Sequence, residues 1–597
     1  MLNQKINKKI VLIKYFIFIV FALISFKLIY LQGFKHNYYV NEVKESQKIV
    51  YSLTAPRGKI YDRNGVLLVD NEPIKIIRYS KLDRDSKEEI EIANKLAEIL
   101  DVPDTESSEI TNKKAATIYE RMNNGYYYDI KTIKENVTEE EYALIAELNI
   151  DGLFAEIGWK RIYKYDAFKT LLGNVGNIPA EKLEYYLDKG YSINDKVGIS
   201  YIEEIYDDIL KGEKSKYIFE NNEYKLLSEG KKGNDIYLTI DINLQMKIEE
   251  ILENEIKKAK KEANTKYYDG SYVIISNPTS GEILAMAGKK YENGHFSDST
   301  SNLLTTTVTA GSSIKGASHI VGYKTGALEI GELRKDYCIK IKGTEAKCSW
   351  KKMGVLDDLT ALKYSSNSYQ FQTAIKLGSG TYEYNKALTL KDNTLTRYRE
   401  IFAEFGLGVK TGIDFFESTG YKGTKDDSGL ILDFAIGQYD TYTPIQLSQY
   451  INTIVTGKRL KPLILKGYNQ NEKYIEINPV VLNKVNIENT YLERVQEGFR
   501  LVMLGGGTGY NYIASKYKPA GKTGTSTSYI DTNNDNIVDT ATTTNTFVAY
   551  APYDNPTVTF TVISPNVKPA YSSSNYKTSV NQKISYQVSQ KFFEIYK

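Results

Sequence analysis

Histidine and cysteine are scarce in this sequence of 597 residues, which contains only 3 His and 2 Cys. These counts exclude an array of zinc fingers and a disulfide-rich scaffold. The excess of charge is also small, because 77 Lys and Arg residues stand against 74 Asp and Glu residues and leave a formal charge of +3. A dedicated nucleic-acid-binding protein is therefore not expected. The remaining composition, with 42% hydrophobic and 25% charged residues, is that of a globular protein rather than a disordered one.

One long hydrophobic run is present, and it lies at the N-terminus. Residues 10–31 are apolar except for Lys14 and Lys27 near the two ends, and a helix of this length spans roughly 33 Å, enough to cross a bilayer. Lysines in the preceding residues 1–9 predict that this short tail stays in the cytoplasm. The alternative is a cleaved signal peptide, but the run is long for one and no small-x-small cleavage site follows it. We therefore expect a single-pass protein of the cell membrane with a large extracellular body.

The rest of the chain divides into two regions by its texture. Residues 32–235 mix short strand-like stretches with helices, such as those expected over 86–100 and 137–148. Residues 236–597 begin with a strand and a long amphipathic helix. Alternating stretches then predict a hairpin that turns at 277–281, strands over 546–550 and 557–564, and a last helix over 580–596. Strands at both ends of a helical middle predict one α/β domain whose sheet is assembled from distant segments.

Few residues in this chain can supply a nucleophile. The scarcity of histidine gives little support to a Ser-His-Asp triad, so a serine activated by lysine is the pattern to look for. Ser312 and Lys315 form such a Ser-x-x-Lys pattern after Gly311. The apolar spacing that follows predicts a helix beginning near Ser312, which would place these two side chains on one face and backbone N–H groups near a developing oxyanion. The pattern alone is weak, because it also occurs by chance at Ser574 to Lys577.

A second candidate is the sequence Ser365-Ser366-Asn367. A hydroxyl and an amide two residues apart can both reach one cleft from a short turn between helices. The hydroxyl could then pass a proton, and the amide could hold a substrate carbonyl. Taken alone, the triplet would be read as an ordinary Asn-Ser turn.

The third candidate is Lys-Thr-Gly, which occurs at 324–326, 410–412 and 522–524. The first copy continues a helix and the second lies in a glycine-rich connection. The third precedes a polar turn and a strand, so it is the one expected on the first strand of a hairpin. There Lys522 offers charge to a carboxylate, and Gly524 lets a ligand approach the backbone. Hydroxyl groups are offered by Thr523 and Thr525.

Together and in this order, the three motifs are those of penicillin-binding proteins and class A β-lactamases. The chain resembles a class B penicillin-binding protein, the monofunctional membrane-anchored transpeptidase of bacterial cell-wall synthesis. Residues 57–65 are similar to the signature at the base of the non-catalytic pedestal, and 238–245 to the entry of the transpeptidase domain. The segments 197–203, 315–317 and 406–412 are most like the elongation, or rod-shape, branch of Gram-positive bacteria.

The resemblance implies a fold and a domain order. We expect a mixed α+β pedestal or dimerisation domain over 32–235, after the cytoplasmic tail 1–9 and the anchor 10–31. An α/β (α+β) transpeptidase domain of the penicillin-binding-protein/β-lactamase type should follow over 236–597. The implied partners are peptidoglycan stem peptides, β-lactams, the cytoplasmic membrane and a membrane-embedded glycan polymerase of the shape, elongation, division and sporulation type. No cofactor, metal or nucleic acid is implied.

The resemblance also implies an activity. The chain would be a peptidoglycan D,D-transpeptidase that cross-links stem peptides through an acyl-serine, binds penicillin, and acts in cell elongation and shape. A septal or sporulation transpeptidase is an alternative within the class. A D,D-carboxypeptidase or β-lactamase shares the three motifs, but the pedestal signature and the anchor argue against it. A β-lactam sensor or an inactive scaffold is the third class.

Each motif residue receives a role from the family. Ser312 would attack the carbonyl of the penultimate D-alanine, and Lys315, kept neutral by burial and by the nearby charge of Lys522, would be the general base. Ser365 would relay the proton to the leaving amine, and Asn367 would orient the lysine and the substrate amide. The terminal carboxylate would be held by Lys522, Thr523 and Thr525. The oxyanion hole would consist of the backbone N–H groups of Ser312 and Thr525.

The two cysteines, Cys338 and Cys348, lie between the first two motifs. Some elongation-type relatives have a metal site of Cys, Asp and His ligands in this region, but here Met353 stands where such a histidine would be. A disulfide, a metal site and two free thiols all remain open from the sequence.

Residues 531–539 contain part of the pattern of a calcium-binding loop. Asp531, Asn533 and Asp535 have the spacing of the first ligands of a calcium loop. The glycine after Asp535 and the glutamate at the twelfth position are missing. A solvated hairpin turn is therefore the favoured interpretation.

Overall fold

The computed structural model describes residues 50–596, except 83, 125–129, 194, 221–222, 263–264, 534, 536 and 571–578. It also describes five isolated positions between 21 and 35. The anchor predicted over 10–31 therefore lies almost entirely outside the described residues. Among the residues that are described, none of the helices combines the length and the apolar character needed to cross a membrane.

The N-terminal region contains both helices and strands. Its helices are α3 (Ser86–Ile99), α4 (Lys113–Asn123), α5 (Glu139–Glu147), α6 (Lys169–Leu172), η2 (Ala180–Lys182), α7 (Leu183–Asp188), α8 (Tyr201–Ile205) and α9 (Asp207–Leu210). Its strands are β1 (Val50–Leu53), β2 (Ile60–Tyr61), β3 (Leu67–Ser80), β4 (Ile130–Glu135), β5 (Leu153–Tyr163), β6 (Val175–Asn177), β7 (Lys196–Gly198), β8 (Ser215–Glu220) and β9 (Glu223–Ser228). The helices predicted over 86–100 and 137–148 are confirmed as α3 and α5.

A seven-stranded sheet connects the two regions. Its order is β20-β19-β10-β2-β3-β4, with β5 paired to β3. Strand β10 (Ile236–Leu238) runs parallel to β2, and it pairs on its other side with β19 (Leu465–Gln470), which is followed by β20 (Lys473–Glu476). Backbone segments about 175 and 400 residues apart along the chain thus share one sheet, which ties the N-terminal region to the C-terminal one.

The segment 57–65 holds this junction together with buried charges. Arg57 donates to the carboxylate of Asp207 at 2.7 Å and forms an ion pair with Glu203 at 3.0 Å. The carboxylate of Asp62 is fully buried, and it accepts from the backbone N–H groups of Asn64 and Val66, both at 2.8 Å. The two buried charges of this segment therefore have a structural explanation, because Arg57 and Asp62 each have hydrogen-bonding partners.

The C-terminal region is built on a six-stranded antiparallel sheet of order β13-β12-β11-β24-β23-β22. Its strands are β11 (Gly270–Ser276), β12 (Ile283–Glu292), β13 (His295–Asp298), β22 (Ala520–Ile530), β23 (Thr540–Ala551) and β24 (Val558–Pro569). The predicted hairpin that turns at 277–281 is confirmed as β11 and β12. The sheet is assembled from distant segments, as expected, because β11 pairs with β24.

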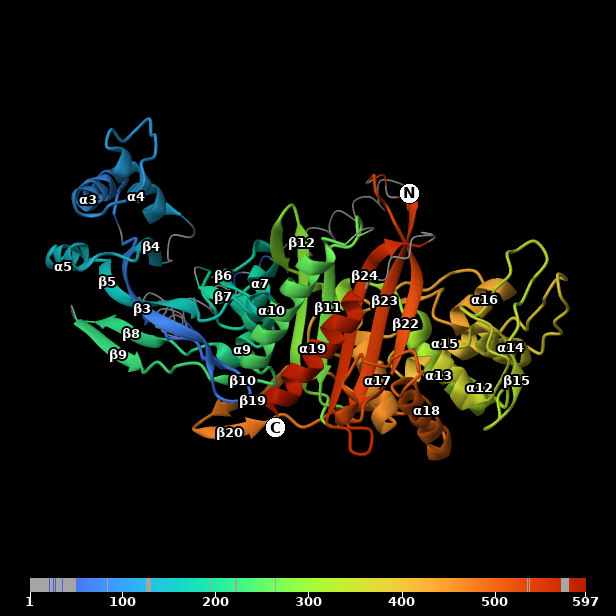
Figure 1. Ribbon diagram of the computed structural model, residues 1–597. Coiled ribbons are helices and arrows are strands. Elements are labelled where there is room, and N and C mark those ends of the chain that lie inside the picture. Colours follow the sequence, from blue (N-terminus) through green and yellow to red (C-terminus); the bar gives the residue numbers. More distant parts are fainter. Residues whose placement is uncertain are drawn as a thin grey trace, which may run out of the picture.

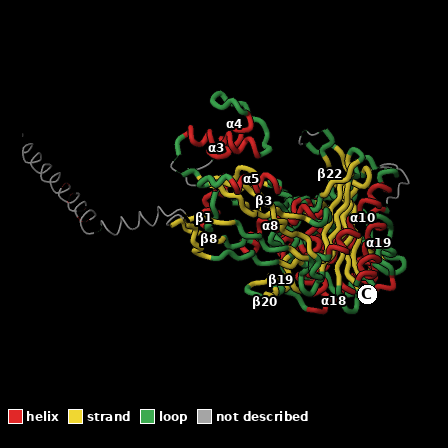
Figure 2. Tube along the Cα trace, turned by 90° about the vertical axis from the view of Figure 1, so that its left-hand side faces the viewer, coloured by secondary structure: helices red, strands yellow, loops and turns green. Residues whose placement is uncertain are grey.

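Helices cover both faces of this sheet. Helices α10 (Ile242–Ala259) and α19 (Val580–Ile595) contact each other and pack on one face, while α17 (Pro444–Thr456) packs on the other. Figure 1 shows the sheet between the N-terminal region at one end and a group of helices at the other, and Figure 2 shows α10 and α19 along one side of the sheet. The remaining elements are α11 (Asn302–Thr305), β14 (Val308–Thr309), η3 (Gly311–Ile314), α12 (Lys315–Thr325), β15 (Arg334–Lys335), β16 (Val355–Leu356), α13 (Asp358–Tyr364), α14 (Asn367–Leu377), α15 (Thr394–Glu404), α16 (Ser428–Ala435), β17 (Thr441–Tyr442), β18 (Lys458–Leu460), β21 (Val481–Lys484), α18 (Asn489–Val502) and η4 (Ser515–Tyr517).

Candidate active site

Ser312 lies in a tight turn against the edge strand of the six-stranded sheet. The turn is the 3-10 helix η3, which continues directly into α12, so the predicted helix begins as a 3-10 turn. Gly311 has φ +55°, and its N–H donates to the carbonyl of Gly437 at 2.8 Å. A Cβ atom on Gly311 would lie 2.6 Å from the carbonyl oxygen of Thr525. Glycine is therefore required here, because only a residue without a side chain lets the turn approach β22 so closely.

Lys315 follows at the start of α12, with its side chain fully buried. Its Nζ donates to the carbonyls of Ser365 at 2.8 Å and Ser366 at 3.1 Å, and to Oδ1 of Asn367 at 2.7 Å. Among the described residues, the hydroxyl of Ser312 is not one of its acceptors. Burial lowers the pKa of Lys315 well below its usual value, and the nearby Lys522 lowers it further. A lysine with such a pKa can be a base at neutral pH.

The second motif forms the turn between α13 and α14. Ser365 ends α13 in the left-handed conformation, with φ +60°. Ser366 is the N-cap of α14, and its hydroxyl accepts from the N–H of Tyr369 at 3.1 Å. This sharp reversal directs the side chain of Asn367 and the carbonyls of both serines toward Lys315. The alternative of an isolated Asn-Ser turn is therefore too simple, because the turn is a binding site for a lysine side chain about 50 residues earlier.

The third Lys-Thr-Gly sequence lies on β22, in the hairpin with β23. The side chain of Lys522 is fully buried, and its Nζ donates to the hydroxyl of Ser365 at 3.0 Å and to the carbonyl of Thr523 at 2.8 Å. Burial lowers the pKa of Lys522 to about 7. A Cβ atom on Gly524 would lie 2.4 Å from the carbonyl oxygen of Ala310, just before the turn that carries Ser312. This copy of the motif is thus in contact with the other two motifs.

The other two copies of Lys-Thr-Gly lie in structural positions. Lys324, at the end of α12, forms an ion pair with Glu404. Thr411 donates to the carboxylate of Glu417 at 2.7 Å and is fully buried. Each copy is therefore satisfied within the fold by its own carboxylate partner.

A cleft of about 440 Å³ opens over the three motifs. Five of the eight predicted site residues line it, namely Ser312, Ser365, Asn367, Thr523 and Thr525. Lys315 and Lys522 are fully buried and do not line the cleft, but each donates to Ser365, which lines it. Gly524 lies between Thr523 and Thr525 on β22. Residues that the sequence analysis missed also line the cleft: Trp350, Ile436, Gln438, Thr508 and Tyr512. They belong to no motif, and the only sequence signal was that Trp350 is one of just 2 tryptophans.

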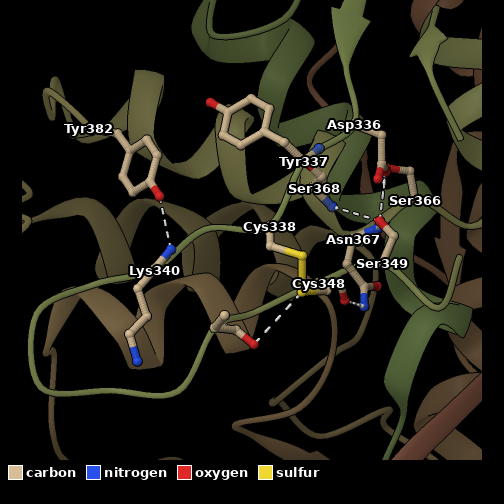
Figure 3. Close-up of a disulfide and its surroundings, with 11 residues drawn as sticks. Asp336, Tyr337, Cys338, Lys340, Cys348, Ser349, Ser366, Asn367, Ser368 and Tyr382 are labelled. Carbon is tan, nitrogen blue, oxygen red and sulfur yellow. Dashed lines mark hydrogen bonds between the residues drawn. A yellow bond between two sulfur atoms is a disulfide. The ribbon is translucent and has the colours of Figure 1, made fainter. Parts of the chain in front are cut away.

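Cys338 and Cys348 form a disulfide beside the cleft (Figure 3). The carbonyl of Cys348 accepts from the side-chain amide of Asn367 at 3.1 Å. Of the three alternatives that the sequence left open, the structure has the disulfide. Within the described ranges, no group of three or more His, Cys, Asp or Glu side chains is arranged to hold a metal ion.

The described residues of the segment 531–539 lie in the turn of the hairpin between β22 and β23. Strand pairing reaches Ile530 and Thr540, and the hydroxyl of Thr532 donates to the carboxylate of Asp539 at 2.8 Å. The interpretation as a hairpin turn is confirmed.

Comparison with known proteins identifies the family. The sequence family of the penicillin binding protein transpeptidase domain matches residues 271–590. The family of the penicillin-binding protein dimerisation domain matches residues 52–238. The chain is 35% identical to penicillin-binding protein 2A of Bacillus subtilis (strain 168), over 97% of this chain and 92% of the relative. The chain belongs to the class B penicillin-binding proteins.

Other class B penicillin-binding proteins and solved structures agree with this assignment. Peptidoglycan D,D-transpeptidase MrdA of Escherichia coli (strain K12) is 24% identical over 88% of this chain and 86% of its own length. The structure of penicillin-binding protein 2B from Streptococcus pneumoniae (strain 5204) has a TM-score of 0.78 at 26% identity, and covers 91% of this chain and 99% of its own. The penicillin-binding protein of a Helicobacter pylori complex with MreC shares the fold, with a TM-score of 0.68 at 18% identity over 92% of this chain and 99% of its own.

Proposed function

We propose that Ser312 is the nucleophile of the peptidoglycan D,D-transpeptidase reaction of this class B penicillin-binding protein. The observation that carries the proposal is the buried amine of Lys315, whose three close acceptors all belong to the second motif. The hydroxyl of Ser365, in the same motif, also accepts a hydrogen bond from Lys522 of the third motif. A single cleft thus joins a serine, a base with a lowered pKa and a carboxylate-binding cation, which is the set of groups that acyl transfer through a serine requires.

Acylation begins with a proton transfer. The hydroxyl of Ser312 attacks the carbonyl carbon of the penultimate D-alanine and gives its proton to the neutral amine of Lys315. A charged lysine has three N–H groups, which match its three nearest acceptors at 2.7–3.1 Å, and the hydroxyl of Ser365 is a fourth, longer contact at 3.4 Å. The neutral amine has two N–H groups and a lone pair, so it releases one contact and can accept the proton.

The leaving group then departs as the terminal D-alanine. Ser365 donates its hydroxyl proton to the leaving amine and takes back the proton that Lys315 received from Ser312, because the hydroxyl of Ser365 lies 3.4 Å from Lys315 Nζ and 3.0 Å from Lys522 Nζ. An amine from a neighbouring stem peptide resolves the acyl-serine and forms the cross-link. A β-lactam acylates the same serine and remains bound.

The substrate is held by β22 and the turn of Ser312. The charge of Lys522 and the hydroxyls of Thr523 and Thr525 bind the terminal carboxylate. The backbone N–H groups of Ser312 and Thr525 bind the oxyanion, each contributing roughly 3 kcal/mol. The closeness of Gly311 to the backbone of Thr525 supports this pair, because it brings the turn of Ser312 against β22 and both Ser312 and Thr525 line the cleft.

The cellular setting is part of the proposal. Residues 10–31 anchor the protein in the cytoplasmic membrane, with residues 1–9 in the cytoplasm, the pedestal over 32–235 and the extracellular catalytic domain over 236–597. We expect a role in elongation and shape, with a membrane-embedded glycan polymerase as partner. The apolar run at the N-terminus and the solved complex of a protein of this fold with MreC support this setting.

Labelling of the full-length protein with fluorescent penicillin tests the nucleophile. Wild-type protein should be labelled at Ser312, as identified by mass spectrometry, and Ser312→Ala should not be labelled. Ser574→Ala is the matched control, because Ser574 begins the other Ser-x-x-Lys sequence, and it should be labelled as wild type. Label that survives in Ser312→Ala would disprove the assignment. Product analysis with a pentapeptide donor and an acceptor amine then separates cross-linking from hydrolysis.

A further inference from the structure

A serine outside the three motifs holds the second motif in place. The hydroxyl of Ser349 accepts from the backbone N–H of Asn367 at 3.0 Å and from that of Ser368 at 3.2 Å. The same hydroxyl donates to Oδ2 of Asp336 at 2.7 Å. One donor and two acceptor positions are all that a hydroxyl has, so Ser349 uses its full hydrogen-bonding capacity at this one place.

These bonds fix the N-terminus of α14. The first N–H groups of a helix have no partner within the helix. The hydroxyl of Ser366 accepts from the N–H of Tyr369. The two preceding N–H groups donate to Ser349, which lies 18 residues before Asn367 in the chain. Asp336 accepts from both serine hydroxyls, at 2.7 Å and 2.6 Å. Its negative charge lies near the positive end of this eleven-residue helix, where it is favourable.

The residue next to Ser349 sets the orientation of the Asn367 amide. The carbonyl of Cys348 accepts from Nδ2 of Asn367 at 3.1 Å, which leaves Oδ1 to face Lys315 Nζ at 2.7 Å. A flipped amide would present its NH₂ group to the lysine and its oxygen to a carbonyl, and would lose both bonds. The dipeptide Cys348-Ser349 thus holds the backbone and the side chain of Asn367 together.

The segment that carries Ser349 is itself fixed at both ends. The disulfide joins Cys348 to Cys338, and the bond from Ser349 to Asp336 closes the same loop one residue further along at one end and two residues earlier at the other. Figure 3 shows these groups side by side, with Ser349 between Asp336 and the start of α14. The loop is therefore a rigid support and not a free connection.

We propose that Ser349 is a positioning residue for acyl transfer, which acts through Asn367 to set the position of the Lys315 amine. The inference rests on the proposed function, since it assumes that Lys315 is the base. Removal of the Ser349 hydroxyl should slow the chemical step, because a shift of about 1 Å in a catalytic group can cost on the order of 100-fold in rate. Binding of the β-lactam before acylation should change little, because Ser349 does not line the cleft.

The test is a stopped-flow measurement of acylation by a reporter β-lactam on the full-length protein, over a range of pH. For Ser349→Ala we expect a maximal acylation rate roughly 10- to 100-fold below wild type, an unchanged dissociation constant for the first complex and a shifted pH midpoint of the acid limb. Ser349→Thr keeps the hydroxyl and should recover most of the rate. Asp336→Asn keeps an acceptor oxygen without the charge, and its maximal acylation rate should lie between those of Ser349→Ala and Ser349→Thr. Thr138→Ala is the control, because it removes an N-cap hydroxyl from α5, far from the cleft.

The outcomes separate this inference from the proposed function. Wild-type protein that is not acylated at Ser312 would overturn both. Normal acylation of wild type together with a wild-type rate and pH midpoint in Ser349→Ala would overturn the role of Ser349 alone. A lower melting temperature of Ser349→Ala with an unchanged rate would show a structural cap and would also overturn it. If Ser349→Ala does not fold, a wild-type rate and pH midpoint in Asp336→Asn would overturn it.

Discussion

Lys315 and Lys522 are both fully buried, and both donate to the hydroxyl of Ser365, at 3.4 Å and 3.0 Å. Two charged ammonium groups at one oxygen repel each other, and burial removes the water that would screen them. Accordingly, burial and Lys522 lower the pKa of Lys315, and burial lowers that of Lys522 to about 7. The pair can thus divide the work at neutral pH, with one lysine as base and the other as cation.

The first prediction concerns the pH dependence of acylation. The rate should rise with pH as Lys315 loses its proton, and should fall as pH rises through about 7, where Lys522 loses the charge that we propose binds the substrate carboxylate. The maximal acylation rate divided by the dissociation constant of the first complex should therefore have a bell-shaped dependence on pH. Arginine stays charged throughout this range, so Lys522→Arg should remove the alkaline limb. An alkaline limb that is the same in Lys522→Arg and wild type would contradict the assignment.

The second prediction concerns stability. A lysine with a lowered pKa in the folded protein binds more protons when unfolded, so its contribution to stability rises with pH between about 7 and its ordinary value of 10.5. Lys522→Met should therefore melt at a higher temperature than wild type at neutral pH, with a gain of about 1.4 kcal/mol per unit of pKa lowering, and the gain should shrink toward pH 10. Penicillin labelling should fall strongly. Lys324→Met, in another Lys-Thr-Gly copy, should show neither effect, and a destabilised Lys522→Met would speak against the burial argument.

The third prediction concerns the contact between β22 and the turn of Ser312. A Cβ atom on Gly524 would lie 2.1 Å from Oγ1 of Thr546 and 2.4 Å from the carbonyl of Ala310. Gly524→Ala should push the strand from the turn, at a cost of about 1–3 kcal/mol in stability and roughly 100-fold in acylation rate. Gly505→Ala is the control, since nothing lies within 4 Å of an added Cβ there. Equal acylation rates in the two variants would refute the close approach.

The fourth prediction concerns a buried carboxylate, that of Asp358 at the start of α13. Asp358 accepts from two nitrogens of Arg494, each at 2.8 Å, and from the hydroxyl of Tyr323 at 2.6 Å. Burial tends to raise the pKa of Asp358, but the bonds from Arg494 and Tyr323 outweigh it and lower the pKa. Stability from this group is therefore present above the unfolded pKa and is lost as pH falls through the folded one.

Arg494→Met should leave this carboxylate buried and without its cation, at a cost of about 3–5 kcal/mol at neutral pH. The loss should diminish in acid, where Asp358 becomes protonated. Thermal unfolding across pH measures both effects. Lys518→Met removes an exposed ion pair with Asp554 and should cost less than about 1 kcal/mol. A loss in Arg494→Met that is equal at pH 4 and pH 7 would contradict the explanation.

Features that depend on near neighbours in the chain could be predicted from the sequence. The capping box of Thr138 and Glu141 marks the start of α5, and the structure has both of its hydrogen bonds. The turn at 277–281 and the hairpin of Lys522 are also local, since turn residues and alternation decide them. The hairpin context was enough to separate Lys522 from the other two Lys-Thr-Gly copies.

Features that depend on distant partners could not be predicted. The parallel pairing of β2 with β10 joins short strands about 175 residues apart. The sequence of neither strand predicts which strand it pairs with. Ser349 and Gln438 lie in no motif. Gln438 matters because it lines the cleft, and Ser349 because it accepts from the backbone of Asn367, which lines the cleft. The cysteines were ambiguous for a similar reason, because a spacing of ten residues suits a disulfide, a metal site or free thiols, and the surrounding fold decides among them.

The disulfide has a consequence for the timing of maturation. Cysteine thiols stay reduced in the cytoplasm and are oxidised outside it. A newly made chain on the inner side of the membrane would therefore carry Cys338 and Cys348 unlinked, and the carbonyl that holds the Asn367 amide would be free to move. With the extracellular catalytic domain proposed above, this disulfide would form only after export, in the compartment where the stem peptides are. Export would then complete the enzyme as well as deliver it.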